Sequence, residues 1–132
     1  MKRLSLFIYF FLITVLQAAA QQSFDKAAVK SVMKRVADWQ IANPNKGAEH
    51  DDLDWTHAAL YMGMLDWAEL TEKEDSDDSY YQWLLRIGQR NHFQIGKWMY
   101  HADFIAVGQP FIDLYLKYGN KKMIAPVMAR AN

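Results

Sequence analysis

Apolar side chains recur at helical spacing along the chain, and polar stretches rich in turn-forming residues separate them. In the first segment, residues 25–41, the apolar positions follow one another at intervals of three and four, which places them on one face of a helix. These positions are Val29, Val32, Val36 and Trp39. Ser23 or Asp25 can cap the start of the helix, and a turn with Pro44 and Gly47 ends it.

Three further helices are predicted, over residues 54–70, 78–91 and 103–118. Asp54 is a suitable N-cap for the first of these, because its carboxylate can accept from free backbone N–H groups. Gly63 inside that helix weakens it, so close packing of another backbone is expected there. In the last of the three, Pro110 predicts a kink and Gly119 a C-cap.

The remaining segments are predicted to be two loops and a short helical end. Residues 71–79 form a charged, solvated loop, residues 92–102 form a loop with aromatic and histidine side chains, and residues 121–131 start helically until Pro126 interrupts them. No segment shows the alternation of apolar and polar residues that is typical of a strand. We therefore predict an all-α fold of stacked antiparallel hairpins, with its functional loops gathered on one face.

The N-terminus has the three-part pattern of a secretory signal peptide. Lys2 and Arg3 precede an apolar run from Leu4 to Leu16, and small alanines follow before Gln21. A membrane-spanning helix needs about 20 apolar residues, so this run is too short for a permanent anchor. We predict a signal peptide over residues 1–20, a single domain over residues 21–132, and a secreted or periplasmic protein with no membrane attachment after cleavage.

Composition excludes several classes of function. The 132 residues carry 15 basic and 15 acidic side chains, without a basic stripe, so nucleic-acid binding is not expected. The absence of cysteine excludes disulfides, thiolate metal sites and a cysteine nucleophile. Aromatic residues make up 14% of the chain, enough to fill a core and also to line a pocket.

Two clusters combine aspartate, histidine and tryptophan at the start of a predicted helix. The first contains Trp55 and His57 directly after Asp54, and the second contains Trp98, His101 and Asp103. Carbohydrate enzymes use this combination, because flat aromatic rings stack on sugar faces and carboxylates act as acid or base. The sequence therefore indicates a carbohydrate site formed by these two helix starts.

Structural interpretations of the same residues remain open. Asp54 and Asp103 can be plain helix caps, the histidines can be packed or exposed without a role, and the tryptophans can belong to the core. The spacing of the four histidines matches no metal-ligand motif, so a metal site is not expected.

Three stretches resemble one family, the unsaturated rhamnogalacturonyl and unsaturated glucuronyl hydrolases. Residues 54–64 (DWTHAALYMGM) resemble the family's opening motif "DWTNGALYAGM". Residues 100–103 (YHAD), followed by residues 107–109 (VGQ) and 111–115 (FIDLY), are similar to the family's "YHAD…VGQ…LY" stretch. Residues 123–126 also fit the continuation of that stretch, so the resemblance runs from about Val36 to Arg130.

This resemblance implies an (α/α)6 barrel, a double ring of helices, without a metal or organic cofactor. It implies hydrolysis of a Δ4,5-unsaturated uronic acid, galacturonyl as from rhamnogalacturonan, from oligosaccharides made by polysaccharide lyases. Asp103 matches the first of two family aspartates and is the implied catalytic residue. Trp55, His57, Trp98, His101 and Gln109 are the expected substrate-binding residues, although His57 stands where the family has Asn.

The sequence also departs from the family. Its length gives room for four or five helices only, and the later motif "W-x-D-x-L-F-M-x-x-P", which carries the second aspartate, is absent from the 132 residues. We therefore expect the N-terminal part of an incomplete (α/α)6 barrel, inactive by itself.

Two other functions remain compatible with the sequence. A secreted helical-repeat module that binds carbohydrate or protein would also stack short helix pairs, although the two clusters share no wider repeat. A lyase or ordinary glycosidase with the same barrel is the other alternative. The sequence identifies neither the sugar that follows the uronate nor the oligomeric state.

Overall fold

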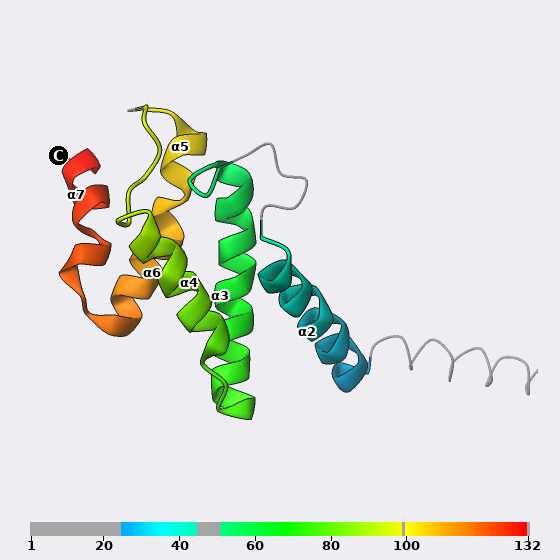
Figure 1. Cartoon of the computed structure of the whole chain (residues 1–132). Coiled ribbons are helices and arrows are strands. Elements are labelled where there is room, and N and C mark those ends of the chain that lie inside the picture. The colour runs from blue at the N-terminus through cyan, green and yellow to red at the C-terminus, as the bar shows by residue number, and fades with distance from the viewer. Residues whose placement is uncertain (1–24, 45–50, 99, 132) are drawn as a thin grey trace, which may run out of the picture. The chain divides into compact units, whose positions relative to one another are not determined.

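The computed structural model of the chain describes residues 25–44, 51–98 and 100–131 (Figure 1). The predicted signal peptide over residues 1–20, the Ser23 cap and the turn at Gly47 lie outside them. The described residues form helices and connecting turns without a strand, which confirms the all-α prediction. The chain divides into two compact units, residues 1–40 and residues 41–132.

Helix α2 (Lys26–Ala42) forms the described part of the first unit. Asp25 caps it as predicted, because the backbone N–H of Ala28 donates to Asp25 Oδ2 at 3.1 Å. The helix ends two residues before Pro44, also as predicted. The apolar side chains of its predicted face are about half exposed: Val29, Val32, Val36 and Trp39.

The second unit is built around helix α3. Its elements are α3 (Trp55–Asp75), α4 (Ser79–Arg90), α5 (Ala102–Ala106), α6 (Gly108–Tyr118), the short 3-10 helix η1 (Lys121–Met123) and α7 (Ala125–Ala131). Helix α3 contacts α4, α5 and α6, so it is their common neighbour. Helix α4 runs back alongside α3, and the chain then returns to the start of α3 before α5 begins (Figure 1).

The core of this unit consists of aromatic and aliphatic side chains on the facing sides of these helices. Its most deeply buried large members are Tyr61, Tyr80, Val107, Phe111 and Leu114. The Trp67 and Tyr80 rings meet edge to face, with centroids 5.7 Å apart, across the α3–α4 contact. Aromatic pairs in this geometry stabilise a core beyond their burial of apolar area.

The prediction of a loop over residues 71–79 is wrong, because α3 continues to Asp75 and only residues 76–78 connect it to α4. The charged residues of this last turn lie on the solvent side of a helix rather than in a loop. Thr71 explains the continuation. Its buried hydroxyl donates to the Trp67 carbonyl at 3.1 Å and lies 3.3 Å from the Asp77 carbonyl, so it ties the helix end to the turn.

The expectation that a backbone packs closely against Gly63 is also wrong. Gly63 is exposed, and a Cβ built there would have no neighbour within 4 Å. Gly88 in α4 is the glycine that a close approach requires. A Cβ at Gly88 would overlap the ring of Phe93, so that ring can pack only against a residue without a side chain.

The predicted kink at Pro110 is a full break between α5 and α6. Pro110 has no N–H to donate to the carbonyl of Ala106, four residues earlier, and α5 ends at that residue. Gly119 ends α6 with a φ of 69°, and its N–H donates to the Tyr115 carbonyl at 2.7 Å. The helical end over residues 121–131 is interrupted between η1 and α7, before Pro126 and not at it. Pro126 lies in the first turn of α7, where its missing N–H costs no hydrogen bond.

Alanine substitutions at Gly63 and at Gly88 should change the stability of the chain in opposite directions. Gly88→Ala must displace the Phe93 ring, and we expect it to destabilise the chain by about 1–3 kcal/mol. Gly63→Ala meets no neighbour and improves helix propensity, so we expect it to stabilise the chain by about 0.5–1 kcal/mol. Chemical denaturation of both variants measures the difference. Equal effects of the same sign would contradict the packing described for Gly88.

Candidate functional site

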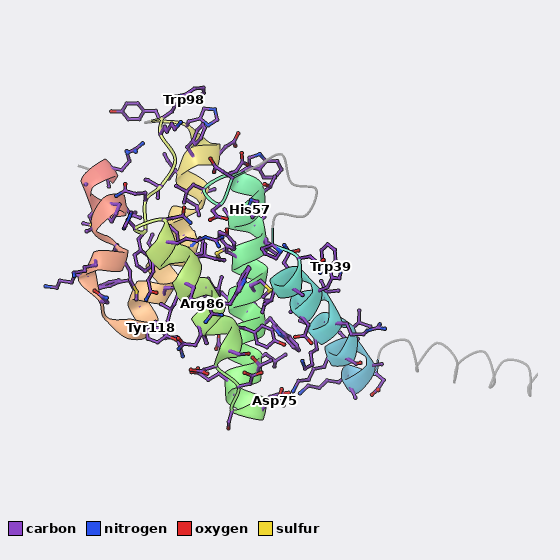
Figure 2. All side chains as sticks on the ribbon, in the orientation of Figure 1. Trp39, His57, Asp75, Arg86, Trp98 and Tyr118 are labelled. Atoms are coloured by element: carbon purple, nitrogen blue, oxygen red, sulfur yellow. The ribbon has the colours of Figure 1, made fainter. Side chains whose placement is uncertain are left out.

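The two clusters singled out in the sequence lie at the same end of the second unit. Because α3 and α4 are antiparallel, the start of α3 lies beside the end of α4 and the loop after it. Figure 2 shows His57 and Trp98 toward this end, whereas Asp75 lies at the opposite end of α3. The hairpin therefore gathers the start of α3, the loop after α4 and the start of α5 in one region.

Trp98, His101 and Phe104 form a cluster of rings at the start of α5. The ring centroids are 5.5 Å apart for Trp98 and His101, 5.2 Å for Trp98 and Phe104, and 5.0 Å for His101 and Phe104. Trp98 remains 62% exposed, so much of its surface is open to a ligand. An exposed ring held by its neighbours can stack on a sugar with little loss of conformational entropy.

Asp103 lies beside this cluster, in the first turn of α5. Its Oδ2 is 3.9 Å from Nδ1 of His101, and the two side chains are 56% and 42% exposed. That separation permits an ion pair when His101 is protonated, but it is too long for a hydrogen bond. Within the described part of the chain, Nδ1 of His101 has no hydrogen-bond partner. The structure thus brings together three predicted site residues, Trp98, His101 and Asp103.

The loop that carries Trp98 is fixed to α5 through Gly96. The Gly96 N–H donates to the Phe104 carbonyl at 2.7 Å. A Cβ at Gly96 would overlap the Phe104 side chain, so this approach requires glycine. Between the two, Tyr100 adopts a positive φ of 64° and is 92% exposed. The reversal at Tyr100 directs the chain from Trp98 back into α5.

Trp55 and His57 occupy contrasting environments at the start of α3. Asp54 caps the helix as predicted, because it accepts from the Thr56 N–H at 3.2 Å, and Trp55 is half exposed as the first helical residue. His57 is only 7% exposed, with its ring centroid 5.8 Å from that of Tyr61. No partner for its Nδ1 is found among the described residues. His57 thus lies in the core, whereas Trp55 is available to a ligand.

Gln109 lies on the exposed side of α6. Its Nε2 donates to Oδ1 of Asp113 at 3.1 Å, four residues further along the same helix. The ring contacts at the start of α5 involve Trp98, His101 and Phe104 instead. The amide of Gln109 is thus engaged along its own helix.

Sequence reasoning missed the strongest polar interaction of this region, at Asp52. Nε and Nη2 of Arg90 donate to the two Asp52 carboxylate oxygens at 2.7 and 2.8 Å, and Nδ2 of Asn91 donates to Oδ2 at 2.8 Å. The contact joins the turn before α3 to the end of α4. No sequence signal could have found it, because 38 residues separate Asp52 from Arg90.

The three donors determine the electrostatics of Asp52. Partial burial by itself would raise the pKa of this carboxyl, but the hydrogen bonds from Arg90 and Asn91 and the Arg90 charge outweigh burial and lower the pKa. The same contact raises the pKa of Arg90. Burial raises the pKa of Tyr61, and the nearby Asp52 charge adds to that effect. Asp52 is thus held as an anion.

Metal-ligand clusters and membrane-spanning helices are both absent from residues 25–44, 51–98 and 100–131. No three His, Asp or Glu side chains there are grouped as metal ligands would be. No helix among them combines the length and apolar character needed to cross a bilayer.

The Asp52 contact predicts that the difference in stability between wild type and an Asp52 variant depends on pH. Folding lowers the pKa of Asp52. The contribution of this carboxylate to the free energy of unfolding is therefore complete above the ordinary pKa of an aspartate, and it is lost as pH falls through the lowered pKa. We expect Asp52→Asn to unfold at a lower temperature than wild type near neutral pH, and the gap to shrink below about pH 4. Thermal unfolding followed by circular dichroism measures both. A gap that stays constant into acid would contradict the assignment.

Comparison with known proteins bears on what this region does. The family model described as Glycosyl Hydrolase Family 88 matches residues 14–132. No curated protein and no solved structure matches the chain. The match includes every residue of the region described above and agrees with the all-helical fold. The resemblance seen in the sequence is thereby confirmed at the level of the family, and the chain belongs to glycosyl hydrolase family 88.

Proposed function

We propose that residues 21–132 form the N-terminal part of an (α/α)6 hydrolase that acts on oligosaccharides ending in a Δ4,5-unsaturated uronyl residue, galacturonyl as from rhamnogalacturonan. Family membership supports a glycoside hydrolase and a carbohydrate substrate. The motifs of the sequence support the unsaturated uronide. The region at the starts of α3 and α5 is where we expect the sugar to bind.

The observation that carries this proposal is the grouping of Trp98, His101 and Asp103. An exposed indole offers a flat surface for the sugar ring, and an exposed carboxylate lies near it in the sequence and in space. The imidazole of His101 contacts the indole and comes within 3.9 Å of the carboxylate. Three different chemical groups thus converge on one surface, whereas a plain helix cap would need only the carboxylate.

The proposed reaction hydrates the C4=C5 double bond of the uronyl residue. A carboxylic acid donates a proton to C4, water adds its oxygen at C5, and the remaining proton of the water returns to a carboxylate. The resulting hemiketal opens and releases the next sugar. Protons and electrons balance with water alone. We assign Asp103 as a carboxylate that faces the unsaturated sugar, with Trp55, Trp98 and His101 contacting the substrate.

Residues 21–132 expressed alone should bind the substrate without turning it over. They include Asp103 but not the second aspartate motif of the family. We expect this chain to bind an unsaturated uronyl-rhamnose disaccharide without releasing the uronate, because the second aspartate of the family is the better candidate for the general acid and base. Calorimetric titration measures the binding, and loss of ultraviolet absorbance at the double bond measures turnover.

Two substitutions and a control test the binding residues. We expect Trp98→Ala to weaken binding about tenfold or more, as removal of an exposed aromatic anchor does. Asp103→Asn should weaken it less, since the amide keeps the shape of the carboxylate. The control is Asp66→Asn, which changes an exposed carboxylate of α3 and should leave binding unchanged. Release of uronate by the wild-type chain would contradict the assignment of roles, and unaltered binding by Trp98→Ala would contradict the site.

We also propose that the protein is exported. The support is the sequence of residues 1–20, with its basic start, apolar run and small residues before Gln21. Expression of the whole chain in a bacterium, followed by fractionation and mass determination, tests this. We expect a periplasmic or secreted product that begins at Gln21. A product that keeps residues 1–20 and sediments with the membrane would contradict export by a cleaved signal.

A further inference from the structure

We propose that Asp52 is a positioning residue, which through Arg90 and Asn91 fixes the Trp55 side of the candidate sugar site relative to the Trp98 side. The expected effect of Asp52 on sugar binding rests on the proposed function. Its effect on the positions of Trp55 and Trp98 can be tested without a ligand. Asp52 itself is not expected to touch the substrate.

The contact among Asp52, Arg90 and Asn91, here called the clasp, is more specific than a casual surface ion pair. Arg90 presents two of its nitrogens to the two Asp52 oxygens, at 2.7 and 2.8 Å, and Asn91 adds a third donor to Oδ2. The Asp52 side chain is 14% exposed, whereas Arg90 is 52% exposed. A bidentate pair fixes direction as well as distance, and limited exposure of the carboxylate reduces screening by solvent.

On one side, the clasp leads directly to Trp55. Residues 51–54 form a compact turn, in which the Leu53 N–H donates to Asp51 Oδ1 at 2.9 Å and the Asp54 N–H donates to the Asp51 carbonyl at 3.1 Å. The turn ends at Asp54, the cap of α3, and Trp55 is the next residue. Few free torsions therefore separate the Asp52 carboxylate from the Trp55 side chain.

On the other side, the clasp leads to Trp98 through a packed connection. Nδ2 of Asn91 donates to the Ile87 carbonyl as well as to Asp52, so the residue belongs both to the end of α4 and to the clasp. The next two residues adopt positive φ angles of 53°, and the Phe93 N–H donates to the Gly88 carbonyl at 2.7 Å. The Phe93 ring meets Phe111 edge to face at 5.4 Å.

The connection continues through Ile95, which is 5% exposed, to Gly96, which is hydrogen-bonded to Phe104. Trp98 follows two residues later. Asp52 thus joins two segments that are far apart in the sequence, each of which ends within a few residues of an exposed tryptophan of the candidate site. Loss of the clasp should change the position of one tryptophan relative to the other.

A second ion pair provides a matched comparison. Lys117 of α6 bonds to Glu72 of α3 with an Nζ–Oε2 distance of 2.5 Å. This pair also joins two helices through a carboxylate, but Glu72 lies near the end of α3, far along the helix from Trp55. Glu72→Gln therefore removes an interhelical ion pair without touching the candidate site.

The test uses residues 21–132 labelled with nitrogen-15 and observes the indole N–H resonances of Trp55 and Trp98. We expect Asp52→Asn and Arg90→Lys to shift both resonances, and Glu72→Gln to shift neither. Arg90→Lys keeps the charge but loses the bidentate geometry, and it provides the answer if Asp52→Asn fails to fold. A double variant that combines Asp52→Asn with Arg90→Lys should resemble the single variants, since all three remove one interaction.

The same variants are then titrated with the unsaturated uronyl-rhamnose disaccharide. We expect about tenfold weaker binding for Asp52→Asn and Arg90→Lys at a temperature where both are folded, and no change for Glu72→Gln. Asp52→Glu, which keeps the carboxylate, should recover part of the affinity.

The outcomes separate this inference from the proposed function. Unshifted indole resonances in folded clasp variants, or unchanged affinity despite shifted resonances, would overturn the positioning role. A wild-type chain that does not bind the disaccharide would count against the proposed function, while the indole resonances would still show whether the clasp sets the two tryptophans.

Discussion

The second unit depends on the burial of α3 against three neighbouring helices. At about 1.5 Å per residue, its 21 residues extend roughly 31 Å, enough for α4, α5 and α6 all to pack along it. The large side chains on those facing sides are almost completely buried, and their removal from water is the main source of stability. Because α4 runs antiparallel to α3, this packing also decides that the start of α3 and the loop before α5 lie at the same end.

The elements were largely predictable, because their signals are local. Helical spacing of apolar residues, the Asp54 cap and the Gly119 cap each act within a few residues, and the structure confirms them. The missing N–H of Pro110 also acts locally, but it goes with a break between α5 and α6 where a kink was predicted. The end of α3 was not predictable in this way. Residues 71–75 look like a solvated loop by composition, and they are helical because Thr71 is buried and bonded to the following turn.

The candidate site was predictable only where its residues lie close together in the sequence. Trp98, His101 and Asp103 are close in sequence, so a single turn brings them together. The burial of His57 and the Asp52–Arg90 contact depend on how α3 and α4 pack, which no local pattern encodes. Gly63 failed as a packing signal because a glycine in a helix marks a close approach only when a neighbour is present, as at Gly88.

In the proposed site, a carboxylate and two exposed tryptophans serve one carbohydrate ligand on a helical scaffold. The central claim is that this end of the second unit binds an unsaturated uronide, and titration of the nitrogen-15-labelled chain with the disaccharide tests it most directly. We predict shifts concentrated at Trp55, Trp98, His101 and Asp103, with resonances near Glu72 unchanged. Shifts centred on the Glu72 end of α3, or none at saturating ligand, would contradict the claim.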